Sequence, residues 1–168
     1  MDNFEYFNPT HIVFGKGAIA RLSSLLPHDG RILMTYGGGS IKQNGVYDQT
    51  LAALRGFDVA EFGGVEPNPR YETLMKAVEL ARRQDTRFLL SVGGGSVLDG
   101  TKFIAAAMRF RGDEPWDILG KHARIEDAVP LGAILTLPAT GSESNGNAVI
   151  SRGATREKLA FYSENCLL

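Results

Sequence analysis

Two glycine-rich tetrapeptides carry the strongest chemical signal in this sequence: GGGS occurs at 37–40 and again at 93–96. Each follows a short apolar run, and the second leads into an apolar stretch with helical spacing. Glycines let the main chain approach a ligand closely, and a helix that begins there directs its unpaired N–H groups toward that ligand. These groups and the helix dipole favour an anion. The second tetrapeptide is therefore predicted to bind a diphosphate.

Local capping is the alternative explanation for the second tetrapeptide. Ser96 with Asp99 three residues later is close to a capping box, in which side chains bind the first N–H groups of a helix. A cap does not require three preceding glycines, which favours phosphate binding at 93–96. At 37–40 a flexible turn and a binding loop both remain open.

EPNP at 66–69 also has two interpretations. Asn68 before Pro69 is typical of a helix start, with the asparagine as N-cap and the proline in the first turn. The two prolines also fix the loop, so that the Asn68 amide is held toward a ribose or a base. The residues alone do not decide between these roles.

Better-known motifs are absent or imperfect. The dinucleotide fingerprint G-x-G-x-x-G fails because position 98 is leucine. GSVLDGTK nearly matches the phosphate loop G-x-x-x-x-G-K-[ST], but its last two residues are reversed, so a kinase or ATPase is only a second hypothesis. The histidines are isolated and G-x-S-x-G does not occur, so we expect neither a metal site within this chain nor a serine hydrolase.

Apolar spacing predicts strands and helices that alternate along the chain. The predicted strands are 31–36, 57–62, 87–92 and 131–137, the predicted helices are 17–26, 46–56, 71–83 and 96–108, and hairpins are predicted at 4–14 and 148–162. The strands are apolar without alternation, as expected when helices cover both faces of a sheet. The predicted fold class is α/β, with a doubly wound, mostly parallel, Rossmann-like sheet and an N-terminal β-hairpin.

The loops at the strand ends predict where a ligand binds. In an open parallel sheet, ligands bind beyond the carboxyl ends of the strands. The loops at those ends are 37–40, 63–69, 93–96 and 138–146, and all are rich in glycine or hydroxyl residues. The pattern predicts one site along one edge of the sheet.

Composition argues against several classes of partner. The net charge is −1 at pH 7, so no overall field attracts nucleic acid or anionic lipid. No apolar run approaches the ~18 residues of a membrane span. The single cysteine, Cys166, cannot form an intramolecular disulfide, which favours a cytoplasmic protein. The chain ends on an apolar run at 166–168, and we expect it to be the first part of a longer protein.

GGGSVLDGTK, LPATGSESN and EPNP are quite specific together, and with them the chain resembles the iron-containing (group III) alcohol dehydrogenase family. Its likeness is to the branch of NADPH-dependent aldehyde reductases and butanol dehydrogenases, from FNPTHIVFGKGAI to KLAFYS. The resemblance implies that residues 1–168 are the N-terminal dinucleotide-binding domain, and that the C-terminal helical metal-binding domain is absent from this chain.

The resemblance also implies roles for individual residues. Gly94, Gly95 and Ser96 match the diphosphate loop, with Asp99 as its supporting acid, Thr136 and Asn145 near the diphosphate and nicotinamide side, Lys158 near the nicotinamide ribose, and Asn68 on the adenosine side. Gly38 stands where NAD-preferring members carry an aspartate that holds the ribose 2′-hydroxyl. With no acid there, and with Ser40 and Lys42 nearby, a 2′-phosphate is not repelled, and NADP(H) is the expected cofactor.

The implied reaction is hydride transfer between NADPH and an aldehyde. Family members bind zinc or iron through one aspartate and three histidines that would follow the end of this chain, so the metal that polarises the substrate oxygen has no ligands here. We therefore expect this chain alone to bind nucleotide and to do little chemistry. A non-catalytic module for a phosphorylated ligand is the alternative, and the unpaired N-terminal hairpin suggests a homodimer.

Overall fold

The computed structural model describes residue 5 and residues 7–168. The strands are β1 (Arg31–Tyr36), β2 (Val59–Phe62), β3 (Thr86–Gly94), β4 (Leu131–Leu137), β5 (Asn147–Arg152) and β6 (Glu157–Tyr162). The α-helices are α1 (Ser40–Gln43), α2 (Val46–Ala53), α3 (Tyr71–Arg83), α4 (Gly95–Arg109) and α5 (Asp117–Gly120), and the 3-10 helices are η1 (Ala18–Ser24), η2 (Ser142–Ser144) and η3 (Glu164–Cys166). Within the described part of the chain, no helix is both long enough and apolar enough to cross a membrane.

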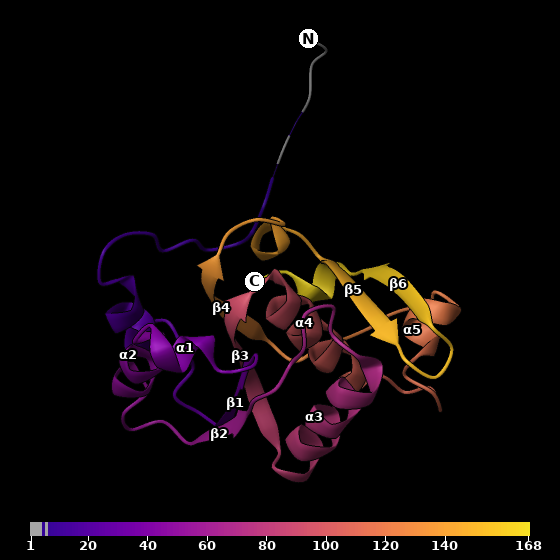
Figure 1. Ribbon diagram of the computed structural model, residues 1–168, viewed down its shortest axis with the longest axis horizontal. Helices are drawn as coiled ribbons and strands as arrows, with labels where there is room; N and C mark the ends of the chain where they lie inside the picture. The colour runs from indigo at the N-terminus through magenta and orange to yellow at the C-terminus, as the bar shows by residue number, and fades with distance from the viewer. Residues whose placement is uncertain (1–4, 6) are drawn as a thin grey trace.

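Four strands form one parallel sheet in the order β2-β1-β3-β4 (Figure 1). Because β1 lies between β2 and β3, the chain passes from β1 to one edge of the sheet and then returns to β3 on the other side. Such a reversal is a topological switch point, and open α/β sheets bind ligands beyond the strand ends at this point. The first GGGS tetrapeptide, 37–40, directly follows β1, and the second, 93–96, contains the end of β3.

Helices cover both faces of the sheet, with α1 and α2 on one side and α3 and α4 on the other (Figure 1). Alternate residues of the central strands divide between the two cores. Leu33 and Leu89 pack in the core that contains α3 and α4, whereas Ile32, Met34 and Leu90 pack with η1, α1 and α2. All five side chains are buried, which is why these strands show no polar alternation.

Helix α4 is the central element of the larger core. All of its residues from Val97 to Ala107 except Asp99 are buried. Phe103 makes edge-to-face contacts with Tyr71 of α3 and Phe161 of β6, at ring-centroid distances of 5.7 and 6.5 Å. The antiparallel hairpin of β5 and β6 therefore packs on α4, and one helix joins the sheet to the hairpin.

The α/β class, the parallel sheet and the hairpin predicted at 148–162 are confirmed. The helix predicted at 17–26 is instead the 3-10 helix η1, in which only Leu22 is buried. So little buried surface does not stabilise a longer α-helix, because helices in water depend mainly on tertiary packing. The helix predicted at 46–56 ends earlier, at Ala53.

The predicted N-terminal hairpin at 4–14 falls partly outside the described residues. Its second arm, 11–14, is described and contains no strand, so that part of the prediction is wrong. A strand requires a hydrogen-bonded neighbour, and within the described residues no strand pairs with this segment. Its side chains Ile12 and Phe14 are 63% and 98% exposed.

The position of Phe103 leads to a stability prediction. Phe103→Ala removes a fully buried ring between α4, α3 and the hairpin, and we expect unfolding to become easier by about 3–5 kcal/mol. The matched control is Tyr162→Ala, since Tyr162 is 60% exposed on the same hairpin and its loss should cost far less. Urea unfolding followed by circular dichroism measures the free energy of unfolding of both variants. Equal decreases in the two variants would contradict the conclusion that α4 is the central element of the core.

Candidate functional site

The loops at the carboxyl ends of the four parallel strands contact one another. The first two, after β1 and β2, are joined by a backbone hydrogen bond of 3.1 Å. The N–H of Asn68 reaches the Ser96 hydroxyl at 3.4 Å. Thr140 approaches Gly95 so closely that a Cβ on this glycine would lie 2.5 Å from the threonine Oγ1. The predicted single edge is therefore formed, with 93–96 in contact with the loops on both sides.

The N-terminus of α4 has no side-chain cap. Its N-cap residue is Gly94, in extended conformation, and no side chain accepts a hydrogen bond from the first turn. The capping-box interpretation is therefore wrong: Ser96 lies inside the helix, and Asp99 Oδ2 accepts a hydrogen bond from the N–H of Val149, 3.0 Å away. A fifteen-residue helix with an uncapped first turn directs unpaired N–H groups and the positive end of its dipole toward the loops.

The structural requirement for glycine differs between the two tetrapeptides. Gly95 lacks a side chain because Thr140 occupies the space. At Gly38 and Gly39 nothing lies within 4 Å of an added Cβ, so the main chain of the first loop faces open space. Gly39 also has a φ of 106°, which favours glycine. The bare backbone of the first loop is thus accessible to a ligand.

Asn68 is not a helix cap. Helix α3 begins at Tyr71 with Arg70 as its N-cap, so the helix-start interpretation of EPNP is wrong. Asn68 has a φ of 55°, and its side-chain Oδ1 accepts a hydrogen bond from the Lys158 ammonium at 2.8 Å. Because the Asn68 N–H also contacts Ser96, a cation from the distant hairpin is linked to the first turn of α4.

Thr136 and Asn145 lie on the β4 side of the same edge. Thr136 is exposed near the end of β4. The Asn145 side chain binds within its own loop: Nδ2 donates to the Gly141 carbonyl at 2.7 Å, and Oδ1 accepts from the Asn147 N–H at 2.8 Å. The structure thus brings both residues to the predicted edge, where Asn145 shapes the loop itself.

The acid of the GGGSVLDGTK segment, Asp99, is half-buried, and its lysine, Lys102, is fully buried. Burial raises the pKa of Asp99, against the opposing effects of the Val149 N–H, the Ser142 hydroxyl and the Lys102 charge. Burial also lowers the pKa of Lys102, against the nearby charge of Asp99. Lys102 was not among the residues predicted for the site, although its apolar neighbours in the sequence indicated a buried position.

A cationic side chain lies beside the first loop. The Lys42 ammonium is 5.0 Å from the ring centroid of Tyr36 and 4.7 Å from that of Tyr47. Its pKa is raised, chiefly through interaction with the Tyr36 side chain. The Tyr47 hydroxyl lies 2.9 Å from both carboxylate oxygens of Glu61, so this nearby acid already has a hydrogen-bond donor. The ends of β1 and β2 thus combine a positioned cation with open glycine backbone.

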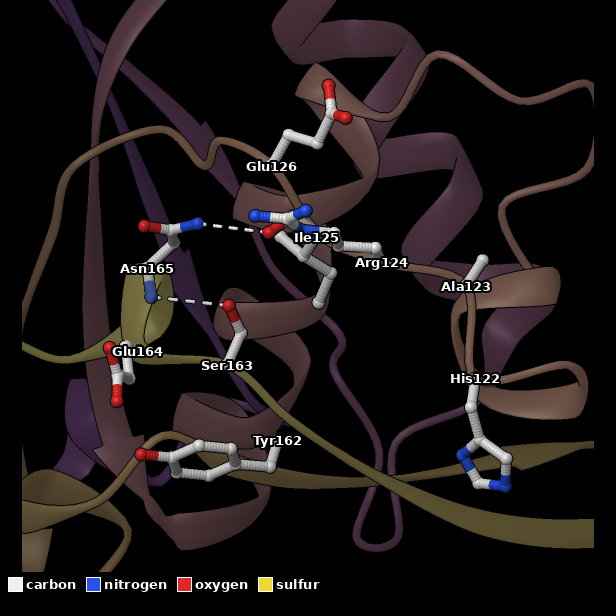
Figure 2. Close-up of a pocket in the computed structure, with 9 residues that line it drawn as sticks. All are labelled: His122, Ala123, Arg124, Ile125, Glu126, Tyr162, Ser163, Glu164 and Asn165. Carbon is white, nitrogen blue, oxygen red and sulfur yellow. Dashed lines mark hydrogen bonds between the residues drawn. The ribbon is translucent and has the colours of Figure 1, made fainter.

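A pocket of 620 Å³ lies elsewhere on the protein. Figure 2 shows the residues that line it, 122–126 before β4 and 162–165 from the end of β6 onward, where the Asn165 side chain donates to the Ile125 carbonyl at 3.0 Å. None of its lining residues belongs to the four strand-end loops. Nearby, burial raises the pKa of the Cys166 thiol to about 11, so it is not a thiolate nucleophile at neutral pH.

Comparison with known proteins now identifies the family. The sequence profile of iron-containing alcohol dehydrogenases matches residues 9–167. The chain belongs to this family. Among its relatives, the NADPH-dependent aldehyde reductase YqhD of Escherichia coli is 62% identical over 165 residues, which are 97% of this chain and 43% of the relative. The probable NADH-dependent butanol dehydrogenase 2 of Bacillus subtilis is 50% identical, over 97% of this chain and 42% of the relative.

Solved structures of iron-containing alcohol dehydrogenases and their relatives have the same fold. The crystal structure of E. coli YqhD matches with a TM-score of 0.94 and 60% identity, over 99% of this chain and 43% of that one. The NADH-dependent butanol dehydrogenase A of Thermotoga maritima matches with a TM-score of 0.93 and 43% identity, over 99% of this chain and 43% of that one. The chain thus spans less than half the length of these relatives. Membership favours the nicotinamide-dependent oxidoreductases over the kinase or ATPase alternative.

The metal implied by the family name does not fit the described residues. Among residue 5 and residues 7–168, no group of three or more His, Cys, Asp or Glu side chains could hold a metal ion. Structural and catalytic metal sites need at least three such protein ligands close together. The described part of this iron-containing alcohol dehydrogenase family member therefore supplies the edge of a parallel sheet and its loops, without a metal centre.

The contact between Gly95 and Thr140 leads to a prediction. Gly95→Val places side-chain atoms where Thr140 Oγ1 lies, so we expect loop 138–146 to shift and its amides to exchange with solvent roughly tenfold faster. Hydrogen exchange with mass spectrometry measures this. Gly38→Ala is the matched control, because its Cβ meets no atom within 4 Å. Unchanged exchange in Gly95→Val would show that the two loops do not pack together.

Proposed function

We propose that this chain is the nucleotide-binding part of an NADP(H)-dependent aldehyde reductase, which transfers hydride between NADPH and an aldehyde. The observation that carries the proposal is the uncapped N-terminus of α4 at the switch point of the sheet, between glycine-rich loops. The name of the E. coli relative supports the reaction and the cofactor.

The diphosphate of the cofactor binds at the first turn of α4. Gly94, Gly95 and Ser96 present main-chain N–H groups, and the helix dipole favours the negative charge. Lys158, tied to this turn through Asn68, adds a positive charge at the nicotinamide side. Because Asn68 lies 2.8 Å from the Lys158 ammonium, it contacts the cofactor beside Lys158, and we do not propose the adenosine-side role that the resemblance implied.

Asp99, Thr136 and Asn145 complete the site. Asp99 acts as supporting acid, because its carboxylate accepts the Val149 N–H and holds β5 to α4. Thr136 and Asn145 line the diphosphate and nicotinamide side from β4 and the loop that follows it. These assignments combine the family resemblance with the position of each residue at the carboxyl edge of the sheet.

The first tetrapeptide selects the 2′-phosphate. Gly38 presents bare backbone to open space, and Ser40 adds a hydroxyl without charge. Lys42, held over two tyrosine rings, supplies the cation for the 2′-phosphate. The nearby carboxylate of Glu61 accepts a hydrogen bond from the Tyr47 hydroxyl. Since named relatives of this chain include NADPH-dependent and NADH-dependent enzymes, the preference for NADPH depends on these few side chains.

The reaction moves hydride from C4 of the reduced nicotinamide to the aldehyde carbon and a proton to the oxygen, giving an alcohol and oxidised cofactor. In the family, a bound metal ion supplies Lewis acidity to the substrate oxygen. The described residues do not fit a metal, so we assign this chain only the binding and orientation of the nucleotide. The single cysteine supports a reducing, cytoplasmic location.

Titration of the chain with NADPH and NADH, followed by nicotinamide fluorescence, tests the cofactor. We expect NADPH to bind more tightly, and Ser40→Asp to weaken NADPH roughly tenfold because a like charge faces the 2′-phosphate. NADH should change little. Ser23→Asp adds the same charge at an exposed site on η1 and serves as control. Equal affinity for both cofactors, unaltered by Ser40→Asp, would refute the cofactor assignment.

We also propose that the chain forms a homodimer through its N-terminal segment. Residues 11–14 contain no strand, and the rings of Phe7 and Phe14 are 84% and 98% exposed. A second copy packed on this segment would cover these rings. We expect a dimer in sedimentation velocity and a monomer after Phe14→Glu, with Leu25→Glu, at the C-cap of η1, as control. A monomeric parent chain would rule out this mode of assembly.

A further inference from the structure

A lysine lies in the core of the protein beneath the proposed site. Lys102, on α4, has no exposed surface and is among the largest fully buried side chains of the described residues. Lysine is almost never fully buried unless its charge is compensated. The compensation here comes from main-chain oxygen atoms: the ion pairs formed within the described residues do not include Lys102.

All three donors of the Lys102 ammonium are used on one stretch of chain. The ammonium donates to the carbonyl oxygens of Ser142, Asn145 and Asn147, at 2.5, 2.6 and 3.0 Å. An ammonium group has three N–H donors, and each of them is accounted for. These carbonyls belong to the segment that runs from η2 to the first residue of β5, so one side chain of α4 contacts residues 142–147 at three points.

The same turn forms one wall of the proposed nucleotide site. Thr140, whose Oγ1 fills the space over Gly95, is hydrogen-bonded to the Ser142 hydroxyl at 2.8 Å. One helical turn before Lys102, Asp99 binds the N–H of Val149. The first half of α4 therefore grips the segment 140–149 at two points, directly behind the diphosphate loop.

We infer that Lys102 is a positioning residue of the nucleotide site, whose ammonium holds the 140–147 turn against Gly95. This inference rests on the proposed function for the ligand, but the contact itself does not depend on nucleotide. Without the ammonium, three carbonyl oxygens lose their donor and the turn moves toward solvent to be hydrated. The wall must then be ordered again at each binding event, which weakens binding.

Chemical rescue separates the charge from general damage to the fold. Lys102→Ala removes three methylene groups and the ammonium. The space that these atoms leave matches the n-propylammonium ion. We expect the variant to bind NADPH roughly tenfold more weakly than the parent chain and to exchange amides of 140–147 faster. n-Propylammonium should restore both properties, whereas n-propanol, of the same size and uncharged, should not. Lys121→Ala, on an exposed lysine, is the control.

The outcomes distinguish this inference from the proposed function. If the parent chain does not bind NADPH, the proposed function fails. Amide exchange in the variant still tests whether the Lys102 ammonium holds the 140–147 turn. If exchange and binding in Lys102→Ala equal those of the parent, or if propanol restores them as well as propylammonium, Lys102 has no positioning role.

A measurement on the parent chain covers the case in which the alanine variant does not fold. When the lysine side-chain nitrogens are labelled with ¹⁵N, the protons attached to them give NMR signals if the ammonium group is buried and hydrogen-bonded. We expect one slowly exchanging ammonium signal with cross-peaks to the protons of 142–147, which shifts when NADPH is added. Its absence, or a signal without contacts to this turn, would overturn the inference.

Discussion

Helix α4 has to meet two conflicting demands, and the architecture of the domain depends on how it meets them. From Val97 to Ala107 it is the core of the larger layer, in contact with the sheet, with α3 and with the hairpin. Its first turn, by contrast, has no side-chain cap. Strand β3 runs directly into the helix at Gly94, and the missing side chain of Gly95 leaves room for Thr140 over the turn.

The loop from β4 to β5 is held in place by the same helix. A turn with several inward-facing carbonyls would lose hydrogen bonds with water, and Lys102 supplies the missing donors from the core. Burying a lysine costs free energy, and three short hydrogen bonds to carbonyls offset that cost. Helix α4 therefore supplies both the buried residues of the core and the side chains of Asp99 and Lys102 that hold the segment 142–149.

Relatives that share this fold differ in the cofactor that their names state. A relative 62% identical is named for NADPH and another 50% identical for NADH, while the structures of E. coli YqhD and of the Thermotoga maritima butanol dehydrogenase match this chain with TM-scores of 0.94 and 0.93. Relatives of this chain are thus named for either nucleotide. Under the proposed function, the side chains that discriminate lie at the end of β1, where Gly38, Ser40 and Lys42 stand in this chain. A change of one charge at that position alters affinity for a phosphate without altering the fold.

Local pattern was sufficient for much of the architecture. The apolar runs at 31–36, 87–92 and 131–137 predicted the strands, and the rule that ligands bind at the carboxyl edge predicted that the glycine-rich loops meet there. Helix ends were less well predicted, because the interaction at each end was not local. Asp99 resembled part of a capping box, but its carboxylate binds the N–H of Val149, fifty residues away.

Short-range periodicity and short motifs were therefore enough to predict the class of fold, the edge where the glycine-rich loops meet, and the family. Which side chains contact one another at that edge depends on how distant elements pack. Lys158 contacts Asn68 across ninety residues, and Lys102 contacts the 142–147 turn across forty or more. The arm of the N-terminal hairpin predicted at 11–14 was wrong for the same reason: pairing of a strand depends on a neighbour, and no strand of the described residues pairs with 11–14. Periodicity reports the environment of a residue, whereas its partner is set by how the elements pack.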